Sequence, residues 1–219
     1  MADLALQRKN MVESQVRPSD VTDRRITAAM MALPRERFLP PHLAGLAYSD
    51  GALALGDGRG LMAPRDFARL IQLAVIGDGD RVLDVGSAGG YSAAVLSRLA
   101  REVVALESNH GEALKATATL PEFGGANVKI VSGPLEAGWH EGAPYDVIVV
   151  EGALDAVPAT LLAQLAPGGR LVAILVADGI GRAAVFGPGP GHSAAPRLAF
   201  EASAPRLPGF VSTAEKFVF

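Results

Sequence analysis

The chain has 219 residues, of which 49% are hydrophobic, with a formal net charge of −3 and no cysteine. This length is enough for one well-buried core, and nothing about it requires two domains. The absence of cysteine excludes a disulfide framework and a thiolate metal site, and the scattered Lys and Arg argue against a face that binds nucleic acid. We therefore expect a single domain over residues 1–219, with a helical and loop extension over 1–63 and an α/β core over 64–219.

No segment of the sequence predicts export or membrane insertion. Residues 1–20 mix charged residues with short apolar groups and lack the continuous apolar stretch of a signal peptide. The apolar run at 170–177 is far shorter than the roughly 20 residues that a membrane span needs. We expect a cytoplasmic protein with no nucleic-acid or membrane partner. No metal is expected either, because the four histidines lack metal-ligand spacing.

The N-terminal part of the chain predicts one helix and a long ordered loop. Ser19 or Asp20 can cap a helix that continues through residues 21–33 and ends at Pro34. Residues 39–64 are rich in Gly and Pro but too apolar for a disordered linker, so we expect an ordered loop there. The apolar residues on one face of the predicted helix are Ile26, Ala29, Met30 and Leu33.

From residue 66 onward, helical and strand patterns alternate. A helical pattern over 66–76 is followed by apolar, β-branched runs typical of strands buried on both faces of a parallel sheet. Such alternation predicts an α/β fold, a mostly parallel doubly wound sheet whose ligand crevice lies at the carboxyl ends of the strands. The predicted strands are 81–86, 102–107, 127–133, 145–152 and 169–176, and the helices between them are 91–100, 110–120 and 157–167.

A tract rich in Gly and Pro follows these strands, over residues 178–197. The alternating Gly and Pro within it are typical of a loop rather than a low-complexity domain. We expect two more strands, at 182–187 and 215–219, which could pair as an antiparallel hairpin at the sheet edge.

The turn after the first core strand narrows the ligand class. A P-loop would end in Gly-Lys-Ser/Thr, which is absent. A dinucleotide turn needs the spacing G-x-G-x-x-G, and only Gly86 fits it, because Ala88 and Tyr91 hold the other two places. An S-adenosylmethionine turn instead has an acid on the strand just before the first glycine. Asp84 is such an acid, and a carboxylate suits a ligand that carries an ammonium and a sulfonium. The alternative is an acid that only accepts backbone N–H bonds at the turn.

Glu107 ends the next predicted strand, 21 residues after Gly86. In that place an acid can hold both ribose hydroxyls of a cofactor by two hydrogen bonds. Taken alone, Glu107 could equally be a solvated acid at a strand end. Together with Asp84 and the turn it favours S-adenosylmethionine, and a nicotinamide cofactor stays as a more distant alternative.

Several segments, spread over nearly the whole length of the chain, match the motifs of one known family. The most specific is the Gly-Trp-x-x-x-Ala-Pro-Tyr-Asp element at residues 138–146. The others are NMVESQV at 10–16, VTDRRITAAMMALPRERFLP at 21–40, AYSD at 47–50, RVLDVGSAGGYSAAVLSRL at 81–99 and LLAQLAPGGRLVA at 161–173. By these segments the chain resembles the protein-L-isoaspartate O-methyltransferase family.

The resemblance implies a Rossmann-like S-adenosylmethionine-dependent methyltransferase fold with an N-terminal helical extension. It also implies an activity, the transfer of a methyl group to the free carboxyl of an isoaspartyl residue in a damaged protein or peptide. This step begins protein repair and leaves S-adenosyl-L-homocysteine as product. The candidate cofactor-binding residues are Asp84, Gly86, Ser87, Ala88, Gly89, Glu107, Ser108, Pro134 and Leu135.

The sequence departs from the family at the loop that faces the substrate. Family members have Gly-Gln-Thr-Ile-Ser-x-Pro where this chain has residues 58–64, so Gly60 replaces the threonine and Met62 the serine. A thioether cannot donate a hydrogen bond to a carboxylate, and we assign no catalytic residue. Pro134 stands where the family has an aspartate that holds adenine, and Glu151 replaces a threonine. The candidate substrate-loop residues are Leu61, Met62, Ala63 and Glu151.

The reaction asks little of the enzyme's side chains. A substrate carboxylate is already ionised at neutral pH and needs no general base. Alignment of the reacting atoms can supply roughly 7 kcal/mol or more. Two alternatives to the isoaspartyl activity stay open: methylation of another, unknown small acceptor, and a non-catalytic homologue that binds S-adenosylmethionine or a partner. Arg59 or Arg65 could pair with an anionic substrate, but arginines in such loops are more often solvated, and we expect that here.

Overall fold

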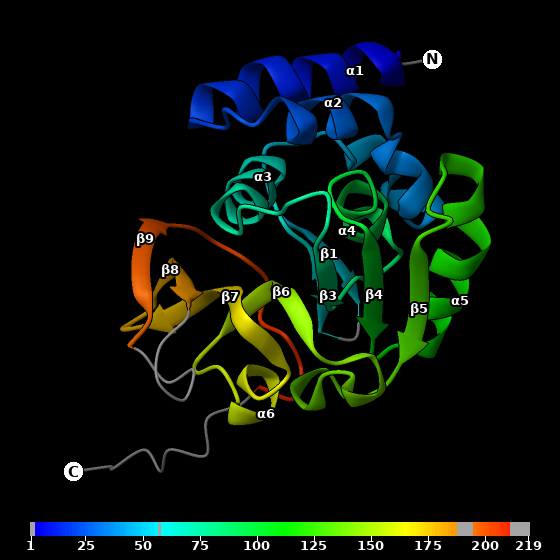
Figure 1. Cartoon of the computed structure of the whole chain (residues 1–219). Helices are drawn as coiled ribbons and strands as arrows, with labels where there is room; N and C mark the ends of the chain where they lie inside the picture. Colours follow the sequence, from blue (N-terminus) through cyan, green and yellow to red (C-terminus); the bar gives the residue numbers. More distant parts are fainter. Residues whose placement is uncertain (1–2, 57, 188–194, 211–219) are drawn as a thin grey trace.

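The fold is built on one mixed β-sheet. The computed structural model describes residues 3–56, 58–187 and 195–210. Within these ranges seven strands hydrogen-bond in the order β5-β4-β3-β6-β7-β8-β9 (Figure 1). The five strands from β5 to β7 are parallel, whereas β8 and β9 are antiparallel. The strand bounds are β3 Arg81–Val85, β4 Glu102–Glu107, β5 Val128–Ser132, β6 Tyr145–Leu154, β7 Leu165–Ala177, β8 Ile180–Phe186 and β9 Arg197–Glu201.

Helices cover both faces of the sheet, and the N-terminal ones lie across α3 and α4 at the top of Figure 1. None of the helices in the described ranges has the length and apolar character needed to cross a membrane. The α-helices are α1 Leu4–Met11, α2 Arg24–Ala32, α3 Pro64–Leu73, α4 Tyr91–Leu96, α5 His110–Thr119 and α6 Ala159–Leu162. The shorter turns are η1 Val12–Val16 (π-helical) and, with 3₁₀ geometry, η2 Arg17–Ser19, η3 Arg35–Phe38, η4 Pro41–Leu46, η5 Leu120–Phe123, η6 Leu135–Ala137 and η7 His140–Gly142.

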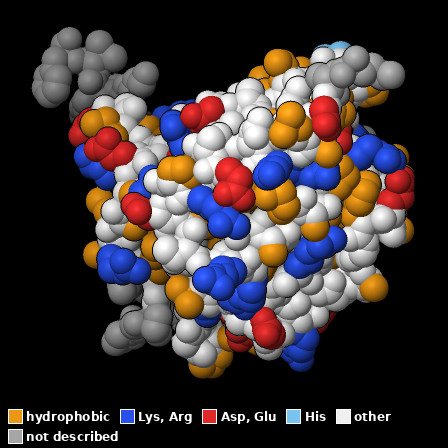
Figure 2. Space-filling model, turned by 90° about the horizontal axis from the view of Figure 1, so that it is seen from above, with side chains coloured by type: hydrophobic (Ala, Val, Ile, Leu, Met, Phe, Trp, Pro, Cys, Tyr) orange, Lys and Arg blue, Asp and Glu red, His pale blue; other side chains and the backbone are white. Residues whose placement is uncertain are grey.

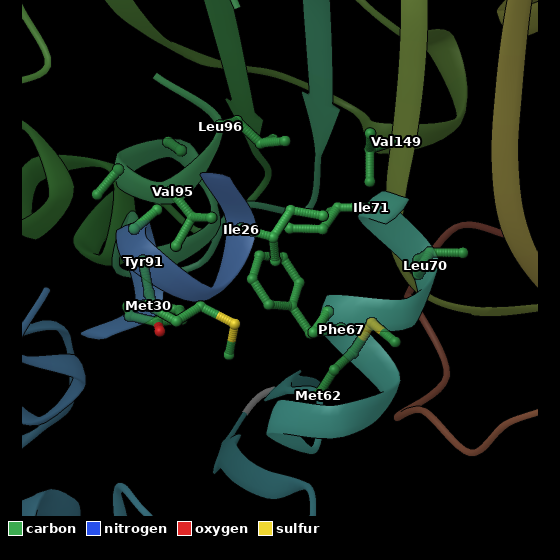
Figure 3. Close-up of a cluster of buried hydrophobic side chains, with 14 of the residues drawn as sticks. Ile26, Met30, Met62, Phe67, Leu70, Ile71, Tyr91, Val95, Leu96 and Val149 are labelled. Carbon is green, nitrogen blue, oxygen red and sulfur yellow. The ribbon is translucent and has the colours of Figure 1, made fainter. Parts of the chain in front are cut away.

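The central strands are apolar on both faces, as the continuous β-branched runs predict. Alternate residues of β3 and β6 enter two separate clusters, so that Val82 and Val149 belong to one and Leu83 and Ile148 to the other. The first core lies between the sheet and the elements α2, α3 and α4. Figure 3 shows part of it, in which Ile26, Met30, Met62, Phe67, Leu70, Ile71, Tyr91, Val95, Leu96 and Val149 converge. The second core lies on the opposite face.

The helix predicted over 21–33 forms, but its N-terminus is capped by a different residue. The side chain of Asp23 accepts a hydrogen bond from the backbone N–H of Arg25 at 2.8 Å, and α2 begins after it. Asp20 has a left-handed backbone with φ of 61°, so the chain turns there and the predicted cap at Ser19 or Asp20 is wrong. The predicted apolar face is confirmed, because Ile26, Ala29, Met30 and Leu33 are all buried.

Two further predictions of secondary structure need correction. The ordered loop of 39–64 contains the turn η4 and a short antiparallel hairpin of β1 (Leu53–Gly56) and β2 (Arg59–Leu61). The helix predicted over 157–167 is reduced to the single turn α6, because Leu165 already pairs with Tyr145 as the start of β7.

The antiparallel edge of the sheet is confirmed in part. The predicted strand at 182–187 is β8, which pairs with β7. Its partner at the edge is β9, which begins at residue 197, where the tract expected to be loop ends, and which was not predicted as a strand. The strand predicted at 215–219 lies outside the described residues.

Charged side chains of both signs are interspersed on the face that Figure 2 shows from above. This matches the modest net charge of −3.

Met62 tests the packing of the first core. Its side chain is 2% exposed and lies beside Phe67 in Figure 3. Met62→Ser would remove buried apolar surface and place a hydroxyl among apolar groups, so we expect a loss of about 3 kcal/mol in the free energy of unfolding, measured by urea titration. Met31→Ser on the half-buried position of α2 is the control and should cost roughly 1 kcal/mol or less. Equal losses in the two variants would contradict this account of Met62.

Candidate functional site

The turn after β3 is held tightly against its neighbours. Gly86 and Gly90 have positive φ angles of 88° and 92°, which glycine adopts without a Cβ penalty. The N–H of Gly86 donates to the carbonyl of Leu106 on β4 at 2.8 Å. A Cβ added at Gly89 would collide with the backbone carbonyl of Phe38. The turn therefore places backbone atoms of glycine residues, without side chains, at the carboxyl ends of β3 and β4.

Three acids lie on one face of the sheet, at the carboxyl ends of three neighbouring strands. Asp84 on β3, Glu107 on β4 and Glu151 on β6 each stand two residues after a member of the first core, and alternate residues of a strand share a face. Their residues are 0%, 0% and 5% exposed, respectively. Buried carboxylates are costly to desolvate, so the surroundings of each one determine its charge.

Glu107 is paired with a buried arginine. Arg59, at the start of β2, is 3% exposed. Its Nε donates to Oε1 of Glu107 at 2.9 Å, and its Nη2 donates to Oε2 at 2.7 Å. The same Nη2 also donates to the carbonyl of Gly86 at 2.8 Å. This contact is bidentate, which is the strongest geometry for an Arg–carboxylate pair.

The backbone adds to the hydrogen bonds on Glu107. The N–H of Ala88 donates to Oε2 at 2.7 Å, and the N–H of Asn109 donates to Oε1 at 2.9 Å. The hydroxyl of Ser108, an exposed residue, also donates to Oε1 at 3.3 Å. Burial acts to raise the pKa of Glu107, but the hydrogen bonds and charge of Arg59 outweigh it and hold the pKa below its ordinary value. Glu107 is therefore an ionised, fully engaged carboxylate.

The expectation that Arg59 is solvated is wrong. An unpaired buried guanidinium would be costly, and the fold meets this cost by placing Arg59 opposite Glu107 rather than in water. For Arg65 the expectation is confirmed, because its side chain is 48% exposed and contacts an equally exposed Asp50 at 3.4 Å.

Asp84 is less well satisfied than Glu107. Its Oδ2 accepts a hydrogen bond from the hydroxyl of Ser92 at 2.7 Å. Its Oδ1 makes no hydrogen bond with the described residues. Burial raises the pKa of Asp84 to about 7, although the bond from Ser92 acts in the opposite direction. The partner is thus a helix hydroxyl, and not the backbone N–H groups of the alternative interpretation.

Glu151 shares the unfavourable surroundings of Asp84. Its Oε1 makes no hydrogen bond with any residue that the structure describes. Burial and the charge of Asp84 raise the pKa of Glu151 well above its ordinary value, while the charges of Arg35 and Arg59 act against this. These surroundings therefore favour the protonated form of Glu151 over the ionised form.

Arg35 is the second buried cation on this face. It is 1% exposed, its Nη2 donates to the carbonyl of Met62 at 2.6 Å, and its guanidinium carbon lies 4.8 Å from the centre of the Tyr91 ring. Burial lowers the pKa of Arg35, opposed by Tyr91 and Glu151. Its backbone contact fixes the loop that contains Met62. Two arginines thus face three acids.

A C-terminal segment crosses the end of β6. The N–H of Ala153 donates to the carbonyl of Pro205 at 2.8 Å, and the N–H of Leu207 donates to the carbonyl of Ala153 at 3.2 Å. A Cβ built on Gly86 would stand 3.1 Å from Nη2 of Arg59 and 3.2 Å from Cδ2 of Leu207. The space beside the turn glycine is therefore filled by side chains of the chain itself.

A groove of about 500 Å³ lies next to Arg59. It lies between the β1–β2 hairpin and the C-terminal segment, and its lining includes Gly58, Arg59, Pro205 and Arg206. The described residues contain no group of His, Asp and Glu arranged to hold a metal ion.

The remaining candidate residues lie at different depths. Ser87 is buried, and its hydroxyl makes no hydrogen bond with the described residues. Pro134 is exposed at the start of η6, and Leu135 packs in the second core, on the face away from the three acids. The candidate substrate-loop residues Leu61, Met62 and Ala63 are all buried.

Sequence reasoning missed the roles of four residues in this site. The sequence offers Arg59 as a partner for an anionic substrate or as a solvated cation, and it shows Arg35 only as part of a family motif. Ser92 and Leu207 carried no signal, because nothing in a single sequence says that a helix hydroxyl or a C-terminal leucine reaches the turn.

Comparisons with known proteins place the chain among methyltransferases. The family model "Protein-L-isoaspartate(D-aspartate) O-methyltransferase" matches residues 6–181. Protein-L-isoaspartate O-methyltransferase 1 of Rhodopseudomonas palustris is 42% identical over 174 residues, covering 80% of this chain and 71% of that protein. The protein-L-isoaspartate O-methyltransferase of Methylorubrum extorquens is also 42% identical, covering 78% of this chain and 74% of that protein.

Solved structures show the same fold. A protein-L-isoaspartate O-methyltransferase structure matches with a TM-score of 0.77 and 27% identity, covering 92% of this chain and 66% of that one. A Plasmodium falciparum structure described as the same type of enzyme, solved in complex with S-adenosyl-L-homocysteine, matches with a TM-score of 0.75 at 18% identity and shows the fold alone. It covers 94% of this chain and 99% of that one.

The raised pKa values of Asp84 and Glu151 predict how stability depends on pH. Between about pH 4 and about pH 7 the folded state holds protons that the unfolded state has released, so the free energy of unfolding should fall as the pH rises. Glu151→Gln removes one of the two groups and should make this fall shallower, as measured by urea titration across that range. A Glu151→Gln profile parallel to that of the unmodified chain would contradict the raised pKa.

Proposed function

Because the chain belongs to the protein-L-isoaspartate(D-aspartate) O-methyltransferase family, whose members depend on S-adenosylmethionine, we propose that it methylates the free carboxyl of isoaspartyl residues in proteins or peptides. S-adenosyl-L-homocysteine is the second product. We also propose a cytoplasmic protein that acts as a single unit over 1–219, without nucleic-acid or membrane partners. The observation that carries the proposal is the buried set of acids beside the glycine turn.

The acids fit the cofactor. The Oδ1 of Asp84, without a hydrogen bond from the described residues, is an acceptor suited to the cofactor's ammonium. Glu107 has the two-oxygen acceptor that a ribose diol requires, and Ser87 adds a hydroxyl at the turn. When bound, S-adenosylmethionine supplies an activated methyl group. Asp84 and Glu107 would hold it, and the buried apolar surroundings exclude water from them.

Glu151 supports a carboxylate acceptor only in its protonated form. A protonated carboxyl has one O–H donor, which can serve where the family has a threonine hydroxyl. An ionised Glu151 would instead repel the substrate carboxylate. We propose that Glu151 orients the acceptor, which leaves the substrate carboxylate itself as the nucleophile and requires no general base.

A second function is favoured by one specific observation. The side chain of Met62, at the family's serine position, is packed in the first core, and Gly60 has no side chain. With both hydroxyls absent, a homologue that binds the cofactor or a partner without methyl transfer is the alternative. Methylation of a different acceptor is a third possibility for the same site.

A methyl-transfer assay separates these functions. The chain is incubated with S-adenosylmethionine labelled on its methyl group and an isoaspartyl peptide, with the same peptide containing an ordinary aspartyl residue as control. We expect base-labile label on the isoaspartyl peptide alone, because methyl esters hydrolyse in base. Calorimetry with S-adenosyl-L-homocysteine is run in parallel. Cofactor binding without labelling of the peptide would rule out the repair activity and favour the alternative functions.

A further inference from the structure

We propose that Arg59 competes with the cofactor for Glu107, so that S-adenosylmethionine is bound only when the guanidinium leaves this carboxylate. The inference rests on the proposed function and concerns the control of its cofactor site. Arg59 would set the affinity for the cofactor without touching the reacting atoms.

The hydrogen-bonding capacity of Glu107 is already used. Oε1 accepts from the Nε of Arg59, the N–H of Asn109 and the hydroxyl of Ser108, and Oε2 accepts from the Nη2 of Arg59 and the N–H of Ala88. A carboxylate offers about four lone-pair sites. The two hydroxyls of a ribose need the positions that the arginine takes.

The same guanidinium also takes the space beside the turn. Its Nη2 donates to the Gly86 carbonyl at 2.8 Å and lies 3.1 Å from where a Cβ of Gly86 would be. A glycine at this position lets a ligand contact the backbone closely, and in this structure the Arg59 guanidinium occupies the place of such a ligand. The Arg59 guanidinium thus occupies both the acceptor oxygens of Glu107 and the space beside Gly86.

Arg59 is among the residues that line the groove of about 500 Å³ beside the hairpin, and this groove would receive the guanidinium, which is 2% exposed while it is paired with Glu107. Its Nη1 makes no hydrogen bond with the described residues, so Glu107 and Gly86 are the two partners that hold the guanidinium. After its departure Glu107 would keep the N–H bonds from Ala88 and Asn109. The departure of Arg59 would therefore free the acceptor positions that the ribose hydroxyls need, while two backbone donors keep the carboxylate in place.

The test compares cofactor affinity with stability in the full chain. In Arg59→Gln the two-pronged charged donor is lost, so we expect S-adenosyl-L-homocysteine to bind at least tenfold more tightly in isothermal titration calorimetry. The Tm of the ligand-free variant should fall, because the buried ion pair is broken. If Arg59 had only a structural role, its replacement would lower both the Tm and the affinity for S-adenosyl-L-homocysteine. A lower Tm together with a higher affinity therefore indicates competition.

Two further variants complete the test. Arg37→Gln breaks an exposed Arg–Glu pair with Glu122 and should change neither quantity. Arg59→Lys keeps the positive charge but cannot make the bidentate contact with Glu107. We expect its affinity for S-adenosyl-L-homocysteine to lie between that of the unmodified chain and that of Arg59→Gln. If Arg59→Gln does not fold, Arg59→Lys serves as the test in its place.

The outcomes distinguish the inference from the proposed function. Tighter binding in the Arg59 variants supports the competition, including the case in which the unmodified chain binds too weakly to detect. If the unmodified chain binds and the Arg59 variants bind no more tightly, the competition is wrong and the proposed function stands. If none of the folded proteins binds S-adenosyl-L-homocysteine, both are wrong.

Discussion

The burial of three carboxyl groups on one face of the sheet is the constraint on which this site depends. It follows from the alternation of side chains along β3, β4 and β6, which sends Asp84, Glu107 and Glu151 to the same side as the first core. Away from water such groups must be paired or protonated. Arg59 pairs with Glu107, whereas burial raises the pKa of Asp84 and Glu151 and so favours their protonated forms.

This constraint gives the N-terminal segment a role beyond covering the sheet. It supplies both buried cations, Arg35 from η3 and Arg59 from the hairpin, and its apolar residues form much of the first core. Arg35 in turn binds the carbonyl of Met62. The loop at the positions of the family's hydroxyls is thus fixed here by Arg35 and by apolar packing, and it has Gly60 and Met62 in place of the two hydroxyl residues.

The C-terminal segment closes the site from the other side. Its backbone pairs with Ala153, and Gly152 leaves the room for this, since a Cβ there would stand 2.5 Å from Cγ of Leu207. Two parts of the chain that are far apart in sequence therefore meet beside Gly86. A methyl transfer that depends on alignment requires such enclosure, because water and misplaced acceptors must be kept from the reacting atoms.

The sequence by itself determined the parallel core, the glycine turn, the positions of Asp84 and Glu107, and the family, because β-branched runs, turn glycines and motif spacing are local properties. It also indicated the missing hydroxyls at Gly60 and Met62. Only the tertiary structure decided that Arg59 faces Glu107 and that Met62 is packed in the core. It also decided that β9 completes the edge of the sheet and that α6 gives way to β7 after one turn. These outcomes depend on pairing between distant segments and on the cost of burying a charge, and neither can be read from the local pattern of a single sequence.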